Sequence, residues 1–232
     1  TSFTSDTVLP ITFPSSTTSL SGTIVGSDGM PLDVSGDKRM DIYISANDIS
    51  TQQDVGADGS YSISLVPGTY NLSVAYYYNI SNPQQHGSFN YNIDDFVVTG
   101  TQTNNISLPT ITVSGTVTDP SGQPVSGARL DIEGYAVDVH GSYANAYTDA
   151  NGSYSIEMLT VDEWNHFSVY PPEGSTELIA FALTDSLSPL TSDTFLPITF
   201  PVSTASLSGT VLRSDGTAYD VSAPTLEVRI DG

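Results

Sequence analysis

Residues 191–222 read TSDTFLPITFPVSTASLSGTVLRSDGTAYDVS, and residues 4–35 read TSDTVLPITFPSSTTSLSGTIVGSDGMPLDVS. The two stretches lie 187 residues apart and are identical at 23 of 32 aligned positions. Shared composition does not produce such agreement, so the chain is periodic and the organisation of the rest follows from this repeat.

A shorter period lies inside the longer one. Ser-Gly-Thr occurs at residues 21–23, 114–116 and 208–210, and Asp-Gly-Ser-Tyr-Ser-Ile at residues 58–63 returns as Asn-Gly-Ser-Tyr-Ser-Ile at residues 151–156. The repeating module is therefore about 93 residues long, a normal size for a small domain. Because the 187-residue repeat is much closer than the 93-residue one, two unlike modules alternate.

Composition limits the class of protein. The chain has 5 Lys plus Arg against 26 Asp plus Glu, a formal charge of −21, which disfavours nucleic acid and anionic membrane surfaces as partners. Cysteine is absent, so disulfide and thiolate chemistry are excluded. No apolar run approaches the roughly 20 residues of a membrane-spanning helix, and no membrane insertion is expected in this segment.

Alternation by two dominates the apolar pattern. Tyr70, Leu72, Val74, Tyr76 and Tyr78 alternate with Asn71, Ser73, Ala75, Tyr77 and Asn79, which is typical of a half-buried strand. Shorter runs of the same kind occur around Leu130, Tyr154 and Phe167, and another is predicted over residues 178–183. Asp-Gly, Asn-Gly, Pro-Gly and Pro-Ser-Gly sequences between these runs supply turns with positive φ, at Gly29, Gly122 and Gly216 among others. Short strands at such spacing predict an all-β fold of antiparallel sandwich modules.

The repeats also predict the module boundaries. Residues 19–110 form the first β-sandwich module and residues 111–204 the second. Residues 1–18 are expected to hold the closing strand of a preceding module, at 5–14, with a linker, and residues 205–232 the opening strands of an incomplete third module. The simplest interpretation is that this sequence is a segment of a longer tandem array. The alternative is strand exchange between subunits, with residues 5–14 as the donated strand.

Three stretches carry a family resemblance: VSGTVTD at 113–119, GQPVSGA at 122–128 and TDANGSYSI at 148–156. They resemble the carboxypeptidase regulatory-like domain, which is closely related to Cna B-type repeats. The resemblance covers nearly all of the second module and the first more loosely, through GADGSY at 56–61 and PGTY at 67–70. It implies tandem seven-stranded, transthyretin-like or Ig-like sandwiches found in secreted and surface proteins, without catalysis of their own.

Individual residues of the motif have structural explanations. Gly115 is expected to open the first strand where the chain leaves a linker, Gly122 to form the hairpin turn, and Pro124 to fix φ as the next segment begins. Tyr61 and Tyr154 are expected to anchor the core from equivalent strands, with each hydroxyl reaching a polar edge.

The sequence contains no convincing catalytic, cofactor or metal site. His86, His140 and His166 lie in dissimilar contexts without the spacing of a zinc site, and no motif supports a Ser-His-Asp triad. The resemblance to Cna B-type repeats raises two further chemistries, an isopeptide bond and calcium binding. Lys38 is the only lysine, so the second module cannot form the isopeptide bond. The acidic pairs Asp94-Asp95 and Asp162-Glu163 lack the alternating oxygen ligands of a calcium loop.

Glycosylation is the covalent modification for which the sequence offers candidate sites. Asn-x-Ser sequons occur at Asn71, Asn79, Asn105 and Asn151, and strand alternation places the first three on polar, solvent-exposed faces. The Ser and Thr residues set among prolines in Thr1–Ser21 and Thr184–Ser208 are further candidates for O-linked sugars.

These observations predict a non-enzymatic, secreted or cell-surface structural protein, a stalk or filament of head-to-tail sandwich modules with an acidic, glycan-coated surface. The partners expected are like modules, from the same chain or a neighbouring subunit, and covalent glycans. Two alternatives remain open. One is an adhesion or carbohydrate-binding module that stacks sugars on exposed Tyr76 to Tyr78 or on Trp164, and the other is an accessory domain of a secreted hydrolase.

Overall fold

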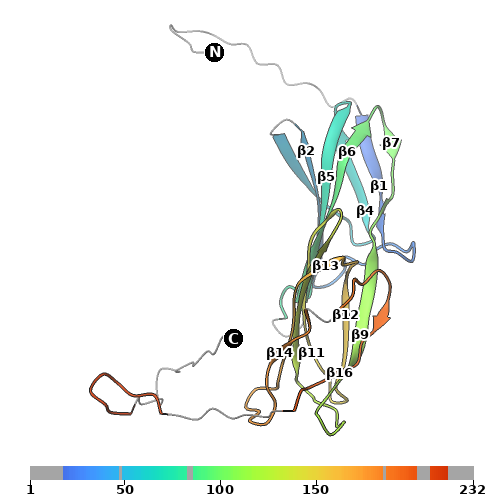
Figure 1. The fold of residues 1–232 in the computed structure, drawn as a ribbon. Helices are drawn as coiled ribbons and strands as arrows, with labels where there is room; N and C mark the ends of the chain where they lie inside the picture. Colours follow the sequence, from blue (N-terminus) through green and yellow to red (C-terminus); the bar gives the residue numbers. More distant parts are fainter. Residues whose placement is uncertain (1–17, 47–48, 83–85, 185–186, 203–209, 219–232) are drawn as a thin grey trace. The chain divides into compact units, whose positions relative to one another are not determined.

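The computed structural model describes residues 18–46, 49–82, 86–184, 187–202 and 210–218 (Figure 1). The chain divides into two units, residues 1–201 and residues 202–232, which are described separately. The first unit is built of β-strands, which confirms the all-β prediction. The predicted closing strand at 5–14 and most of the predicted third module lie outside the described residues.

The strands fall into two successive sets that correspond to the two sequence repeats. The first set is β1 (Thr18–Val25), β2 (Lys38–Ala46), β3 (Ile49–Asp54), β4 (Ser60–Leu65), β5 (Gly68–Tyr78), β6 (His86–Val98), β7 (Gln102–Thr103) and β8 (Ile106–Ser107). The second set is β9 (Thr110–Thr118), β10 (Arg129–Ala136), β11 (Val139–Tyr147), β12 (Ser153–Leu159), β13 (Glu163–Tyr170), β14 (Phe181–Ala182), β15 (Thr194–Phe195) and β16 (Ile198–Thr199).

Two small sheets and one large sheet form the layers. The small sheets have the orders β4-β1-β7 and β12-β9-β15, with β8 also paired to β1 and β16 to β9. The large sheet has the order β14-β13-β10-β11-β6-β5-β2-β3, so it takes strands from both sets. Each small sheet covers the part of the large sheet that belongs to its own set, and the apolar faces enclose one core per set. The number of strands per module and the tandem arrangement stay predictions.

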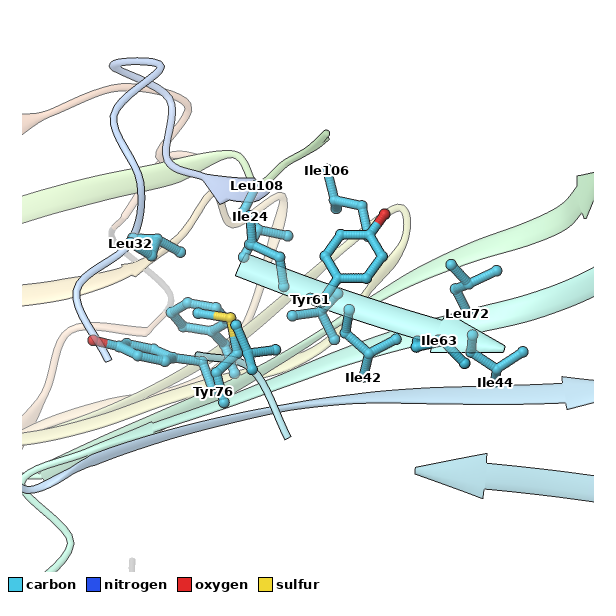
Figure 2. Close-up of a cluster of buried hydrophobic side chains, with 14 of the residues drawn as sticks. Ile24, Leu32, Ile42, Ile44, Tyr61, Ile63, Leu72, Tyr76, Ile106 and Leu108 are labelled. Atoms are coloured by element: carbon cyan, nitrogen blue, oxygen red, sulfur yellow. The ribbon is translucent and has the colours of Figure 1, made fainter. Parts of the chain in front are cut away.

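The core of the first set is drawn in Figure 2, where Ile24, Tyr61 and Ile63 of the small sheet face Ile42, Ile44 and Leu72 of the large sheet. The alternation predicted for β5 is confirmed on its inner face, because Leu72, Val74, Tyr76 and Tyr78 are all buried. On the outer face Asn71 and Tyr77 are exposed, whereas the small Ala75 is covered. Each large side chain buried in this way contributes roughly 1.5–3 kcal/mol to folding.

The second core repeats the first with different residues. Its largest fully buried side chains are Phe167 and Phe200, and Tyr154 and Ile156 occupy the positions that Tyr61 and Ile63 hold in the first core. Phe181 meets Phe200 edge to face with ring centroids 5.5 Å apart. The strand predicted over residues 178–183 is shorter than expected, because only Phe181–Ala182 pairs, with β13.

One turn is present in three copies. In each copy an Asp accepts a backbone hydrogen bond from the residue two positions on, and a Gly with positive φ lies in the same turn. The copies are Asp28 with Gly29 (φ 76°), Asp215 with Gly216 (φ 80°), and Asp119, which bonds Ser121 ahead of Gly122 (φ 86°). The predicted glycine turns are therefore confirmed. The third copy lies in residues 210–218, where a bridge between Leu212 and Ala218 corresponds to the bridges Val25–Pro31 and Thr118–Pro124.

Candidate functional site: the closing strand and the joint between the two sets of strands

The last strand of each set pairs in parallel with the first strand of the same set. In the first set Leu20 lies opposite Gln102 and Ile24 opposite Ile106, and in the second Val113 lies opposite Thr194 and Val117 opposite Ile198. Each closing strand is interrupted in the middle, at residues 104–105 and 196–197. We call the interrupted strands β7/β8 and β15/β16 the closing strands.

A tyrosine and a glycine fix each closing strand at its interruption. The Tyr61 hydroxyl donates a hydrogen bond of 2.6 Å to the Asn104 carbonyl, and the Tyr154 hydroxyl donates one of 2.7 Å to the Leu196 carbonyl. Both tyrosines are only 5% exposed. The prediction that they anchor the core with the hydroxyl at a polar edge is confirmed, and the edge is the closing strand. Burial raises the pKa of the Tyr61 hydroxyl to about 12 and also raises the pKa of the Tyr154 hydroxyl.

The paired glycines are required by close approach of the closing strand. A Cβ at Gly22 would lie 1.9 Å from the Asn104 carbonyl oxygen, and a Cβ at Gly115 would lie 2.0 Å from the Leu196 carbonyl oxygen. The prediction for Gly115 was wrong in its reason, because this residue lies in the middle of β9 and not at the opening of a strand. The glycine of the repeated Ser-Gly-Thr therefore allows the last strand of each set to come close to the first strand.

The two sets of strands are joined through the large sheet. Strand β6 of the first set pairs with β11 of the second in antiparallel register, with His86 opposite Asn145 and Phe89 opposite Ser142. A ladder of backbone hydrogen bonds therefore crosses from one set to the other, and we call this β6–β11 boundary the seam. Figure 1 shows β6 entering the region of β11 and β13.

Side chains reinforce the seam. Val139 and Leu159 of the second set are 2% and 0% exposed and belong to the core of the first set. The Tyr78 hydroxyl donates a 2.9 Å hydrogen bond to the Glu157 carbonyl, and its ring lies against Gly87, where a Cβ would approach it within 2.2 Å. At the connecting segment, Ser27 bonds both the hydroxyl and the carbonyl of Thr110. These contacts make the two sets one packed unit.

An acidic cleft opens beside this joint. It has a volume of about 380 Å³, and its lining includes Asp28, Asp33, Glu157 and Asp193. Burial raises the pKa of the Glu157 carboxyl, Lys38 partly opposes this shift, and Asp33 and Asp28 add to it. Hydrogen bonds from Ser35 and Lys38 hold the pKa of Asp33 well below its usual range. Among the described residues no group of three or more His, Asp or Glu side chains has the arrangement of a metal site.

The remaining candidates from the sequence lie apart from one another. His140 is exposed, His166 lies 3.4 Å from a Glu133 oxygen, and His86 packs beside Tyr143 with ring centroids 5.7 Å apart. Lys38 forms an exposed 2.9 Å ion pair with Asp33. Asp94 and Asp95 are exposed, and Asp95 adopts positive φ.

The sequons lie on accessible backbone, and their use stays a prediction. Asn71, Asn105 and Asn151 are exposed, and Asn79 is half-buried with φ of 51° directly after β5. Asn71 accepts a hydrogen bond from the Asp95 amide, and Asn105 accepts one from the Thr23 amide through its Oδ1. The strand register that places the three predicted asparagines outside the core is therefore correct.

The predicted stacking surface at Tyr76 to Tyr78 was wrong. Tyr76 is 1% exposed and Tyr78 is 7% exposed, because both point into the core of the first set, and only Tyr77 between them reaches solvent. Trp164 is half-buried, packs on Phe167 and donates its Nε1 hydrogen to the Ser188 carbonyl. Neither group offers a free aromatic platform.

The two sets of strands form a β-sandwich fold in which each set has a closing strand paired with its first strand. Residues 112–172 match the model of the carboxypeptidase regulatory-like domain, so the resemblance recognised from the sequence is confirmed over the larger part of the second set of strands. A comparison with curated proteins gave no significant match. In the described part of the chain, no helix has the length and apolar character needed to cross a membrane.

Solved structures similar to this chain include a putative cell adhesion protein, a shaft pilin and the TIE protein. A putative cell adhesion protein of Bacteroides fragilis is 12% identical with a TM-score of 0.37, over 84% of this chain and 100% of that one. The shaft pilin SpaA of Lactobacillus rhamnosus GG is 12% identical with a TM-score of 0.36, over 82% and 99%. The Bacillus anthracis TIE protein is 14% identical with a TM-score of 0.29, and this chain, over 79% of its length, spans 33% of that protein.

Proposed function

We propose that this protein is a non-enzymatic structural protein of the cell surface, in which β-sandwich modules follow one another head to tail as a stalk or filament. The modules are residues 19–110 and 111–204, flanked by segments of like modules. The observation that carries the proposal is that the sequence of a closing strand recurs ahead of the first module. Leu-Pro-Ile-Thr-Phe-Pro stands at residues 196–201 and again at residues 9–14.

The copy of this closing-strand sequence at residues 196–201 lies among the described residues. Ile198 and Phe200 are 4% and 1% exposed in the second core, and the Phe200 amide bonds the Thr118 carbonyl. A second copy with the same apolar residues is suited to the same task in another sandwich. The third copy of the Asp-Gly turn, in residues 210–218, supports an opening segment of a further module. The completing strands come from the same polypeptide or from a neighbouring subunit.

The surface chemistry supports an extracellular role. A net charge of −21 keeps the modules apart, and sugars at Asn71, Asn105 and Asn151 would extend from exposed positions. The exposed edge strand β3 carries Ser, Thr, Gln and Asp, which disfavours sheet-to-sheet aggregation.

The proposal is tested on cells that express the parent gene. Antibodies raised against residues 18–202 should label linear surface structures in electron micrographs. In hot detergent these structures should either stay as one very long polypeptide or dissociate into subunits. Label confined to the cell interior, or surface label without linear structures, would overturn it.

A matched pair of variants separates the two arrangements. In the subunit arrangement, chain 1–232 should form linear oligomers that lengthen with concentration in sedimentation experiments. Phe13→Asp, inside the repeated closing-strand sequence, should prevent this assembly, and Phe3→Asp, outside the repeat, should not. In the single-polypeptide arrangement, the chain stays monomeric with either residue changed.

A further inference from the structure

The outer face of the large sheet carries polar and aromatic side chains in rows that cross the seam. Residues directly opposite each other on neighbouring strands share a face. His86 on β6, Asn145 on β11, Asp131 on β10 and Ser168 on β13 are successive partners and form one row. The next row holds Tyr147, Arg129 and Tyr170. The inner face of the same strands is the apolar core, so the two faces differ sharply in chemistry.

Five of these outer-face side chains form a connected group, which we call the seam cluster: His86, Arg129, Asp131, Tyr143 and Asn145. Asn145 donates through Nδ2 to Asp131, and the Arg129 guanidinium lies 3.0 Å from the other Asp131 oxygen. The guanidinium also lies 4.2 Å from the centre of the Tyr170 ring.

The hydrogen bonding of the seam cluster is incomplete. Within the described residues, Asn145 Oδ1, Arg129 Nε and His86 Nδ1 have no hydrogen-bond partner although all three atoms are shielded from solvent. Asn145 as a whole is only 7% exposed. A shielded polar atom without a partner costs roughly 1–3 kcal/mol, so three in adjacent residues is an unusual concentration. Such groups point to an entering ligand that supplies the missing bonds.

The unsatisfied atoms specify the chemistry of that ligand. Asn145 Oδ1 accepts, Arg129 Nε donates, and the histidine nitrogen can do either, so a group that both donates and accepts satisfies all three. Hydroxyl groups do this, whereas a phosphate or carboxylate only accepts. The charges of Arg129 and Asp131 offset each other, so the cluster itself selects neither anions nor cations. Tyr147 is 38% exposed beside the cluster and offers a ring for the apolar face of a sugar.

We propose that the seam cluster binds a neutral oligosaccharide. Its hydroxyl groups bond Asn145, Arg129 and His86 after local side-chain movement, and a sugar ring stacks on Tyr147. The strands that carry the cluster and Tyr170, from β6 to β13, span about 14 Å at the usual strand spacing, which suits several linked sugars. Because His86 comes from one set of strands and the other residues from the next, the site requires the joined pair. This inference goes beyond the structural role and is independent of it.

The test is titration calorimetry on chain 1–232 produced without glycosylation. The probes are maltohexaose, cellohexaose, mannohexaose and xylohexaose, with a galacturonic acid hexamer and a chitosan hexamer as charged controls. At least one neutral hexamer should bind with a stoichiometry of one. Tyr147→Ala should weaken that binding about tenfold, and Arg129→Ala at least as much.

Tyr43→Ala is the matched control. Tyr43 is 37% exposed on the outer face of β2, away from the cluster, so its removal should change the dissociation constant less than twofold. Thermal melts show whether each variant is folded. Repeating the titration with glycosylated chain separates an external polysaccharide from the protein's own sugars, because the latter would compete. Absence of binding to every neutral hexamer, binding of only the charged hexamers, or equal affinity in Tyr147→Ala would overturn the proposal.

Discussion

Replacing Gly115 by alanine should release the closing strand of the second module. The new Cβ would lie 2.0 Å from the Leu196 carbonyl oxygen, more than an ångström inside contact distance, and the obstacle is backbone and not a flexible side chain. Relief requires β15/β16 to move away from β9. That movement breaks the Leu196 amide bond to the Ser114 carbonyl and the Tyr154 hydroxyl bond to the Leu196 carbonyl.

The expected cost follows from what the closing strand buries. Ile198 and Phe200 leave the core, and each contributes roughly 1.5–3 kcal/mol when buried, so Gly115→Ala should lower the free energy of unfolding by at least about 3 kcal/mol. This is a large part of the 5–15 kcal/mol typical of a domain.

Urea denaturation of chain 1–232, followed by circular dichroism, measures the change. Gly100→Ala is the control, because a Cβ there meets nothing within 4 Å. Gly22→Ala should reproduce the effect in the first module, where the Asn104 oxygen lies 1.9 Å from the added atom. A loss below about 1 kcal/mol for Gly115→Ala, with the control unchanged, would refute the close-approach explanation.

Three further predictions concern the anchors and the joint. The pKa of Tyr61 is about 12 in the folded protein and 10.0 in a free tyrosine. The protonated Tyr61 hydroxyl therefore contributes its full stabilisation of the fold below pH 10, and this contribution is lost between pH 10 and pH 12. Absorbance titration should therefore show Tyr61 ionising only with unfolding, and Tyr61→Phe should remove that part of the alkaline transition. Leu159→Ala should cost about 2–5 kcal/mol and split calorimetric unfolding into two transitions, whereas Val137→Ala, at a position 81% exposed, should leave the melting curve unchanged. Since burial raises the pKa of Glu157, its charge penalises the folded state above that pKa, and the penalty disappears below the unfolded pKa near 4.5. Glu157→Gln should raise the melting temperature at pH 7 and lose this advantage at pH 4, and an equal gain at both values would contradict the assignment.

Local features of the fold were readable from the sequence because they depend on neighbouring residues. The Asp-Gly turns follow from the positive φ that glycine tolerates, and the inner face of β5 follows from alternation by two. Tyr61 and Tyr154 were recognised as anchors because the same pentapeptide, Gly-Ser-Tyr-Ser-Ile, surrounds both.

Features that depend on distant contacts were not readable. Gly115 looked like a strand opening, since nothing in its neighbourhood reveals that Leu196, more than 80 residues later, comes within contact of its Cα. Tyr76 and Tyr78 looked available for stacking because three consecutive tyrosines are unusual, yet the same alternation that identified the strand also buries two of them. The alternation places Tyr76 and Tyr78 on the inner face of the strand, so only Tyr77 was a candidate for stacking.

The seam and its cluster also required the structure. His86 and Asn145 are separated by 59 positions and belong to different repeats, and their pairing arises only when β6 and β11 share a sheet. The signal in the sequence was weak. Arg129, Asp131 and Glu133 alternate with apolar residues on one strand, which indicates an outer face but not what lies opposite.

The parallel pairing of first and last strands has a mechanical consequence. A pull on the two ends of a module draws β1 at its start and β8 at its finish in opposite directions along their common axis. The hydrogen bonds between them, such as Asn104 amide to Ser21 carbonyl at 2.7 Å and Leu108 amide to Val25 carbonyl at 2.9 Å, are then sheared together. A hairpin pulled from its open end would instead lose its bonds one after another. The buried hydrogen bond from the Tyr61 hydroxyl to the Asn104 carbonyl also resists this sliding of the two strands. A pull along the chain therefore acts on the module in the direction in which it is most resistant.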